Sequence, residues 1–150
     1  MTYTEAKDAM RQRFYDKWRV ESPAIVGYTP DVYWKNTEKD FVPPRDKYWC
    51  RFSTQTVIEG QDTLSTCVGE PGKLRYEAQG LVIIQLFCPK SDIQADEKGS
   101  KLAEIARDAF RGKNINGVWF RNARINDGLT PEDLYYRFNV VAEFIYNEIA

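Results

Sequence analysis

Histidine is absent from all 150 residues of this chain, and that absence removes several kinds of chemistry at once. It excludes histidine-based catalytic triads, and it removes the commonest general base and the commonest metal ligand of proteins. No glycine-rich phosphate loop is present either, because the turn Gly69-Glu70-Pro71-Gly72 lacks the lysine and helix that should follow it. No carboxylates have calcium-loop spacing. We therefore expect no metal, no cofactor and no enzymatic activity.

Cysteine is scarce, and the three residues of this type include no pair with CxxC spacing. Cys50 and Cys88 fall in expected strands, so we expect them to be small, reduced core residues of a cytoplasmic protein. Cys67 lies in an expected connection and is the candidate for an exposed thiol, although nothing in the sequence activates it. A small enzyme therefore remains an alternative only if a cysteine or an acidic pair converges with other groups in the fold.

Long apolar runs are missing as well. The longest, residues 81–84 and 86–87, are far too short to cross a membrane. The first residues lack the basic start and the apolar run of a signal peptide, so we expect none. Charge is balanced, with 21 basic and 22 acidic residues, which argues against broad electrostatic binding of nucleic acid.

What the chain does have is the pattern of one soluble globular domain, residues 1–150, rich in aromatic residues. Phe, Trp and Tyr make up 14% of the sequence, and surplus aromatics often lie at protein interfaces. Two stretches, residues 4–19 and 92–111, have helical spacing. The first has a stripe of apolar residues four apart, formed by Ala6, Met10, Phe14 and Trp18. Thr2 with Glu5, and Ser91 with Gln94, have the spacing of capping boxes at the two helix starts, and Gly112 is a candidate C′ glycine.

Alternating stretches predict the strands, at residues 31–34, 48–58, 74–87, 118–126 and 134–149. The last is the clearest, because strict alternation over this length is typical of a half-buried antiparallel strand. Its predicted inward face is Leu134, Tyr136, Phe138, Val140, Ala142, Phe144 and Tyr146. Gly80 lies inside the third strand and suggests a bulge there. Residues 35–47 and 59–73 are expected to be long exposed connections.

Several aromatic residues are next to arginines in the sequence. This pattern is seen in nucleic-acid-binding sites, where nucleotide bases stack on aromatic side chains. The alternative is that the aromatics are core and the arginines pair with acids across the sheet, and the balanced charge favours this alternative. We expect contacts with a protein partner at Trp34, Phe41, Arg45, Arg51, Trp119 and Arg121. A charge at Phe41 is accordingly expected to weaken assembly while leaving folding intact.

Several stretches resemble the tail terminator (tail-completion) proteins of long-tailed bacteriophages. They are residues 76–89, 99–110, 117–120 and 136–146, together with the strand Trp49-Cys50-Arg51-Phe52-Ser53-Thr54. The resemblance covers nearly the whole chain, and it consists of apolar and aromatic positions with no catalytic signature. No functional residue is carried over, because the contacts of that family lie in variable loops.

The resemblance implies an α+β fold, a mostly antiparallel sheet with two helices packed on one face. It also implies a virion protein at the head-proximal end of the tail, assembled in the host cytoplasm. Its partners would be further copies of itself in a hexameric ring, the tail tube protein and the head-side connector protein, with no membrane and no specific nucleic acid. The alternatives are a head–tail connector or tail tube protein of the same virion, and a small nucleic-acid-binding module.

Overall fold

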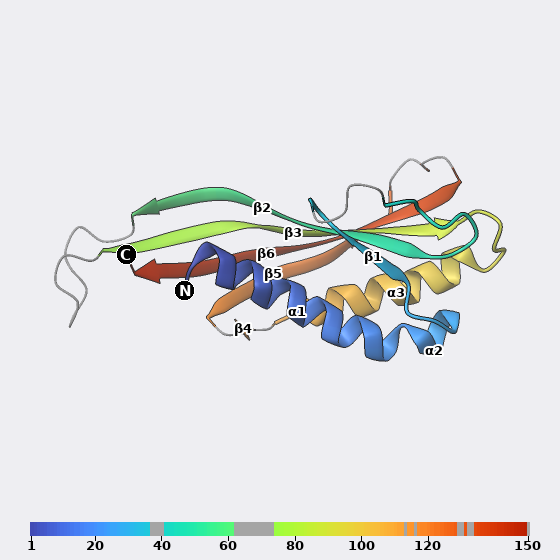
Figure 1. Ribbon diagram of the computed structural model, residues 1–150, viewed down its shortest axis with the longest axis horizontal. Helices are drawn as coiled ribbons and strands as arrows, with labels where there is room; N and C mark the ends of the chain where they lie inside the picture. The colour runs from blue at the N-terminus through green and yellow to red at the C-terminus, as the bar shows by residue number, and fades with distance from the viewer. Residues whose placement is uncertain are drawn as a thin grey trace.

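The computed structural model describes residues 1–36, 41–61, 74–112, 114–115, 117–128, 131 and 134–149. Its elements are α1 (Tyr3–Glu21), α2 (Pro23–Val26), β1 (Asp31–Trp34), β2 (Trp49–Gln61), β3 (Arg75–Pro89), α3 (Ala95–Phe110), β4 (Asn114–Ile115), β5 (Val118–Asn126) and β6 (Tyr135–Ile149). The described strands form one six-stranded sheet in the order β1-β2-β3-β6-β5-β4, antiparallel throughout except for β1 with β2. Figure 1 shows α1 and α3 on the same side of this sheet. The expected α+β fold is confirmed.

The sequence predicts α1 through its cap and its stripe, and both are present. The Thr2 hydroxyl accepts a hydrogen bond from the Glu5 backbone N–H at 3.2 Å, and the Glu5 carboxylate accepts one from the Thr2 N–H at 2.9 Å. The four predicted stripe residues are all buried. The helix runs two residues beyond the predicted end, to Glu21. Pro23 then begins the short helix α2, because proline suits the first position of a helix.

Three long strands form the middle of the sheet, and β6 has the predicted inward face. Its residues Phe138, Val140, Ala142, Phe144 and Tyr146 are buried, whereas Leu134 and Tyr136, also predicted to be inward, remain 40% and 45% exposed. β2 is longer than predicted and reaches Gln61, so the start of the expected connection is strand. The rest of that connection, residues 62–73, lies outside the described residues. The short strand β4 was not predicted.

Gly80 does mark a bulge, as predicted, but the extra residue does not lie in its own strand. The extra residue lies in β2, where the register shifts between Thr56 and Ile58 opposite Gly80. Gly80 is required for a different reason. A Cβ there would collide with the backbone oxygen of Gln55 and come within 2.6 Å of the Phe144 ring. The glycine therefore marks a close approach of the backbone of β2 and a side chain of β6 to β3.

The start of α3 also differs from the prediction. The helix begins at Ala95, and its N-cap Gln94 makes no side-chain capping bond, so the expected capping box of Ser91 and Gln94 is absent. Asp92 turns the chain instead, because its carboxylate accepts the Gln94 N–H at 2.9 Å and the Tyr48 hydroxyl at 2.9 Å. These two bonds, in that order, lower the pKa of Asp92. At the other end Gly112 takes a φ of 61°, as expected of a C′ glycine.

The main core lies between the sheet and the two long helices. It includes the α1 stripe, the apolar residues of α3 and the inward residues of β2, β3, β5 and β6. Cys50 and Cys88 are buried within it, as predicted, and burial raises the pKa of the Cys88 thiol to about 12. Cys67 lies outside the described residues. No helix in the described part of the chain is long and apolar enough to span a membrane.

Candidate assembly surface

A second apolar cluster lies on the face of the sheet opposite the helices. Its buried members are Trp49, Phe87 and Tyr135, with Tyr33 and Phe41 packed against them. Trp49 stacks flat on Phe87 with ring centroids 4.1 Å apart and 8° between the planes. Tyr135 meets both rings edge-on, at 5.8 Å and 5.9 Å. We call these five residues the aromatic cluster; it lies where an antiparallel sheet with one open face would normally be polar.

Arg51, one of the predicted contact residues, lies over the aromatic cluster. Its guanidinium is 5.5 Å from the Phe87 ring centroid, 5.8 Å from that of Trp49 and 5.9 Å from that of Tyr33. Nη1 donates a hydrogen bond to Gln85 Oε1 at 3.0 Å. These contacts hold the planar cation against the aromatic faces. Trp49 and Phe87 are 3% and 1% exposed, so neither ring is open for a base to stack on it.

Phe41, the second predicted residue, belongs to the same cluster, which corrects its assignment to a free exposed loop. Its ring centroid is 5.0 Å from Tyr33 and 5.3 Å from Trp49, and its side chain is half-buried. A charge at Phe41 therefore disturbs packing within the subunit. The expectation that Phe41→Asp leaves folding intact is replaced by the following one.

Phe41→Asp is expected to lower the free energy of unfolding by about 1–3 kcal/mol, because two aromatic contacts are lost and a carboxylate is placed against Trp49. Val42→Asp is the matched control, since the neighbouring side chain is 82% exposed and should change stability by less than about 0.5 kcal/mol. Urea titration of both variants checks this. If both variants change stability by a negligible amount, the Phe41 side chain does not contribute to packing within the subunit.

Trp119 and Arg121 lie on the same open face, toward the other end of the sheet. Trp119 is 58% exposed, and it pairs with Ile145 of β6. Arg121 places Nε 3.6 Å from Glu143 Oε1. Around them, exposed or half-buried apolar side chains form a second feature, which we call the apolar patch. Its members are Val57, Ile58, Leu81, Trp119 and Ile145.

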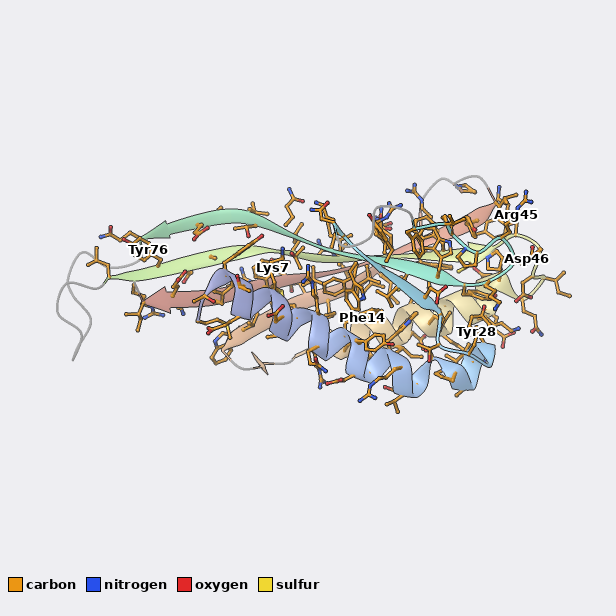
Figure 2. The ribbon with its side chains drawn as sticks, in the orientation of Figure 1. Lys7, Phe14, Tyr28, Arg45, Asp46 and Tyr76 are labelled. Atoms are coloured by element: carbon orange, nitrogen blue, oxygen red, sulfur yellow. The ribbon has the colours of Figure 1, made fainter. Side chains whose placement is uncertain are left out.

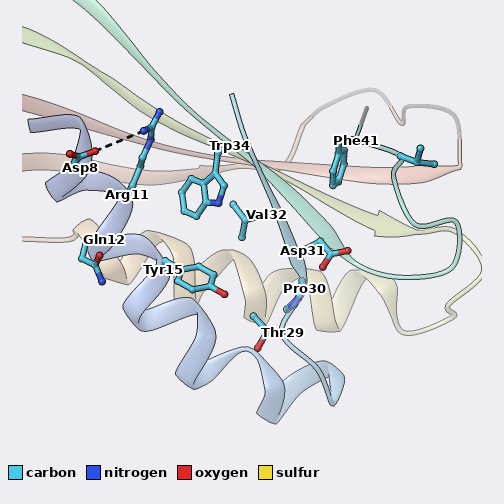
Figure 3. A pocket seen from close by; sticks show the side chains of 11 residues that line it. Asp8, Arg11, Gln12, Tyr15, Thr29, Pro30, Asp31, Val32, Trp34 and Phe41 are labelled. Carbon is cyan, nitrogen blue, oxygen red and sulfur yellow. Dashed lines mark ion pairs between the residues drawn. The ribbon is translucent and has the colours of Figure 1, made fainter. Parts of the chain in front are cut away.

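Trp34 lies elsewhere, on the helix side of the sheet edge. It packs against Phe14, Tyr15 and Phe52, with ring centroids 6.2, 5.9 and 5.2 Å away. Trp34 lines a groove of about 950 Å³ with residues of α1 and β1, and Phe41 lines the same groove from the other side of β1 (Figure 3). Polar residues of α1, among them the ion-paired Asp8 and Arg11, line the α1 side. Trp34 is thus mainly a packing residue with one edge in a polar groove.

Arg45 is exposed at the far end of the molecule, next to Asp46 (Figure 2). The structure therefore brings Phe41 and Arg51 together in one cluster. It places Trp119 and Arg121 further along the same face, whereas Trp34 packs on the helix side and Arg45 is exposed beyond the cluster. The predicted set is not one site, but four of its six residues share the face that the helices leave open.

Sequence reasoning missed Phe87 and Tyr135 as part of this surface. A signal was present in the sequence, because Leu86-Phe87-Cys88 is an uninterrupted apolar run, whereas a strand with one solvated face alternates. Three buried polar atoms on the open face also have no hydrogen-bond partner among the described residues: Trp49 Nε1, Asn139 Oδ1 and Asn147 Oδ1. Buried polar groups are normally paired, so these atoms mark the face as incompletely satisfied in the isolated subunit.

No cluster of three or more histidine, cysteine or acidic side chains that could hold a metal ion occurs within the described ranges. On the open face, Arg51 lies against aromatic rings, and Arg121 and Arg124 lie within 4 Å of Glu143.

Comparison with known proteins bears on the fold. No family model matches the chain, and no curated protein matches it. Seven chains of solved structures are similar. One of them, whose name states no function, has a TM-score of 0.58 at 17% sequence identity, and the match covers 93% of this chain and 94% of the other. At this identity the similarity establishes a shared fold and nothing about activity or partners.

Proposed function

We propose that this chain is a tail terminator of a long-tailed bacteriophage: a structural virion protein that assembles into a closed, hexameric ring. The ring would cap the tail tube at its head-proximal end, stop its polymerisation and present a surface to the head-side connector. The sequence resemblance described above motivates the proposal, and the α+β fold with both long helices on one face agrees with it.

The observation that carries the proposal is the uncovered face of the sheet. It holds the apolar patch, in which Val57, Ile58 and Trp119 are 59%, 63% and 58% exposed, next to the aromatic cluster that the subunit itself buries. A sheet face of this composition is typical of a surface that another protein covers. Since the chain has a net charge of −1, self-association meets little electrostatic repulsion.

The test is assembly of the purified full-length protein, followed by light scattering after gel filtration and by negative-stain images. Closed rings, and capped ends when tail tubes lacking their terminator are added, are the expected results. A monomer that leaves tube length unchanged would overturn the proposal. Long filaments would instead identify a tail tube protein, and an affinity for nucleic acid that falls steeply with salt would identify a nucleic-acid-binding module.

A further inference from the structure

Both sides of the sheet end in strands that are only partly covered. On one side, β1 pairs with β2 at Trp49 to Phe52, and the Lys35 N–H continues this pairing by donating to the Phe52 carbonyl at 3.1 Å. On the other side, β4 pairs with β5 at Val118 and Trp119. Beyond these points, no described strand pairs with residues 53–59 or with residues 120–126 on their outer sides. We call these segments the β2 edge and the β5 edge.

We propose that the β2 edge of one copy pairs antiparallel with the β5 edge of the next copy, so that the sheet continues from subunit to subunit. This rests on the proposed function for the idea that copies assemble, and it names the contact. A pairing between two different edges is heterologous, which is the kind of contact that closes into a ring.

Strand direction fits this contact. β2 is antiparallel to β3, β3 to β6 and β6 to β5, so β2 and β5 run in opposite directions. Rotation about an axis along the strands keeps these directions. The β5 edge therefore meets the β2 edge of a neighbour antiparallel, and the backbone groups of both edges can form a regular ladder.

The hydrogen-bonding phase of the two edges also fits. Phe52, Ile84, Val140 and Ile125 lie in one row across the sheet, each opposite the next. The Phe52 carbonyl points away from β3 and accepts from Lys35, so Phe52 and Ile84 are a non-hydrogen-bonded pair. Hydrogen-bonded and non-hydrogen-bonded pairs alternate across the sheet, so Ile84 and Val140 are a hydrogen-bonded pair and Val140 and Ile125 are not. The backbone N–H and C=O of Ile125 therefore point outward, away from β6. Thr54, two residues after Phe52, points outward as well. Thr54 opposite Ile125 is therefore a hydrogen-bonded pair with both side chains on the helix face.

The bulges select the register. β2 has its extra residue between Thr56 and Ile58, and β5 has its own between Arg121 and Arg124. With Thr54 opposite Ile125, Val57 meets Asn122, so the two extra residues face each other. In this register, the two side chains of each pair lie on the same face of the sheet, both before and after the bulges. The remaining pairs are Gln55 with Arg124, Thr56 with Ala123, Ile58 with Arg121 and Glu59 with Phe120.

Charge disfavours the pairing of two β5 edges with each other. The β2 edge contains one acid, Glu59, and no base, whereas the β5 edge contains Arg121 and Arg124 and no acid. Two β5 edges would bring four arginines together. The β2 edge also lacks the lysines and prolines with which proteins usually block open strands. Ile58, 63% exposed in the subunit, would be covered by the aliphatic stem of Arg121.

A disulfide tests the register directly. Gln55→Cys and Arg124→Cys would form a non-hydrogen-bonded pair between copies, with Cα atoms about 4.5 Å apart, within the range that a disulfide bridges. Within one copy the two positions are three strand spacings apart, about 14 Å, so the bridge can form only between copies. Cys67 is replaced by serine in every variant. After oxidation of the full-length protein we expect a ladder of linked multimers on a non-reducing gel.

Two controls accompany the pair. Thr56→Cys with Arg124→Cys places the thiols on opposite faces and should give no ladder. Ile58→Lys opposes Arg121 and should raise the concentration needed for assembly about fivefold or more, whereas Ile58→Glu, at the same exposed position, should not.

The outcomes separate the two proposals. Closed rings without the cross-link of positions 55 and 124 would overturn the pairing and leave the terminator function standing. Cross-linked multimers that leave tail tubes uncapped would confirm the pairing and overturn the function. Linkage of Ile58→Cys alone into dimers would mean that two β2 edges meet, and it would overturn the pairing.

Discussion

Gly80→Ala is expected to lower the free energy of unfolding by about 3 kcal/mol, although it adds a single methyl group. That methyl would collide with the backbone oxygen of Gln55 in β2 and lie 2.6 Å and 2.8 Å from two atoms of the Phe144 ring in β6. The Phe144 ring is part of the packed core and is 2% exposed, so it has little room to move aside. Relief would require β2 to separate from β3 beside its bulge.

The control for this variant is Gly60→Ala, in the strand that pairs with β3. A Cβ at Gly60 would meet no atom within 4 Å. The same chemical change should therefore be neutral or slightly stabilising, because alanine loses less backbone entropy than glycine on folding. Denaturant titration of the two variants side by side separates crowding from backbone entropy. Comparable stabilities would contradict the close approach described for Gly80.

The regular elements could be predicted because local signals and burial agree along most of the chain. The Thr2 and Glu5 cap and the four-residue stripe placed α1, and alternation placed β5 and the inward face of β6. The start of α3 could not be placed in this way. Two side chains have capping-box spacing there, but Asp92, held by Tyr48 from a distant part of the sequence, turns the chain instead. Such tertiary contacts do not appear in local spacing.

The bulge shows a second limit. A glycine within a strand indicates an irregularity nearby, yet the sequence does not say on which strand the extra residue lies. Here the strand facing Gly80 carries it, between Thr56 and Ile58. The same extra residue selects the register of the proposed contact between copies.

The surface was only partly predictable. Composition indicates more aromatic residues than a core needs, and arginines beside aromatics suggest where they lie. Arg51 and Phe41 do meet, but through Trp49 and Tyr33, which the prediction did not select. Trp34 is a tryptophan with similar neighbours in the sequence to those of Trp49, yet it packs on the helix side of the sheet. Residue type alone does not tell which face of a short edge strand is covered.

Phe138→Ala is expected to lower the free energy of unfolding by about 3–5 kcal/mol, since it removes a large side chain packed between β6 and α3. Phe138 is 7% exposed, and its ring would lie 2.7 Å from a Cβ placed at Gly99. Tyr136→Ala is the matched control, two residues earlier on the same face of β6. That ring is 45% exposed, so its loss should cost under about 1 kcal/mol. Thermal and urea unfolding of both variants measure the difference, and a small effect at Phe138 would mean that the helices cover the other face.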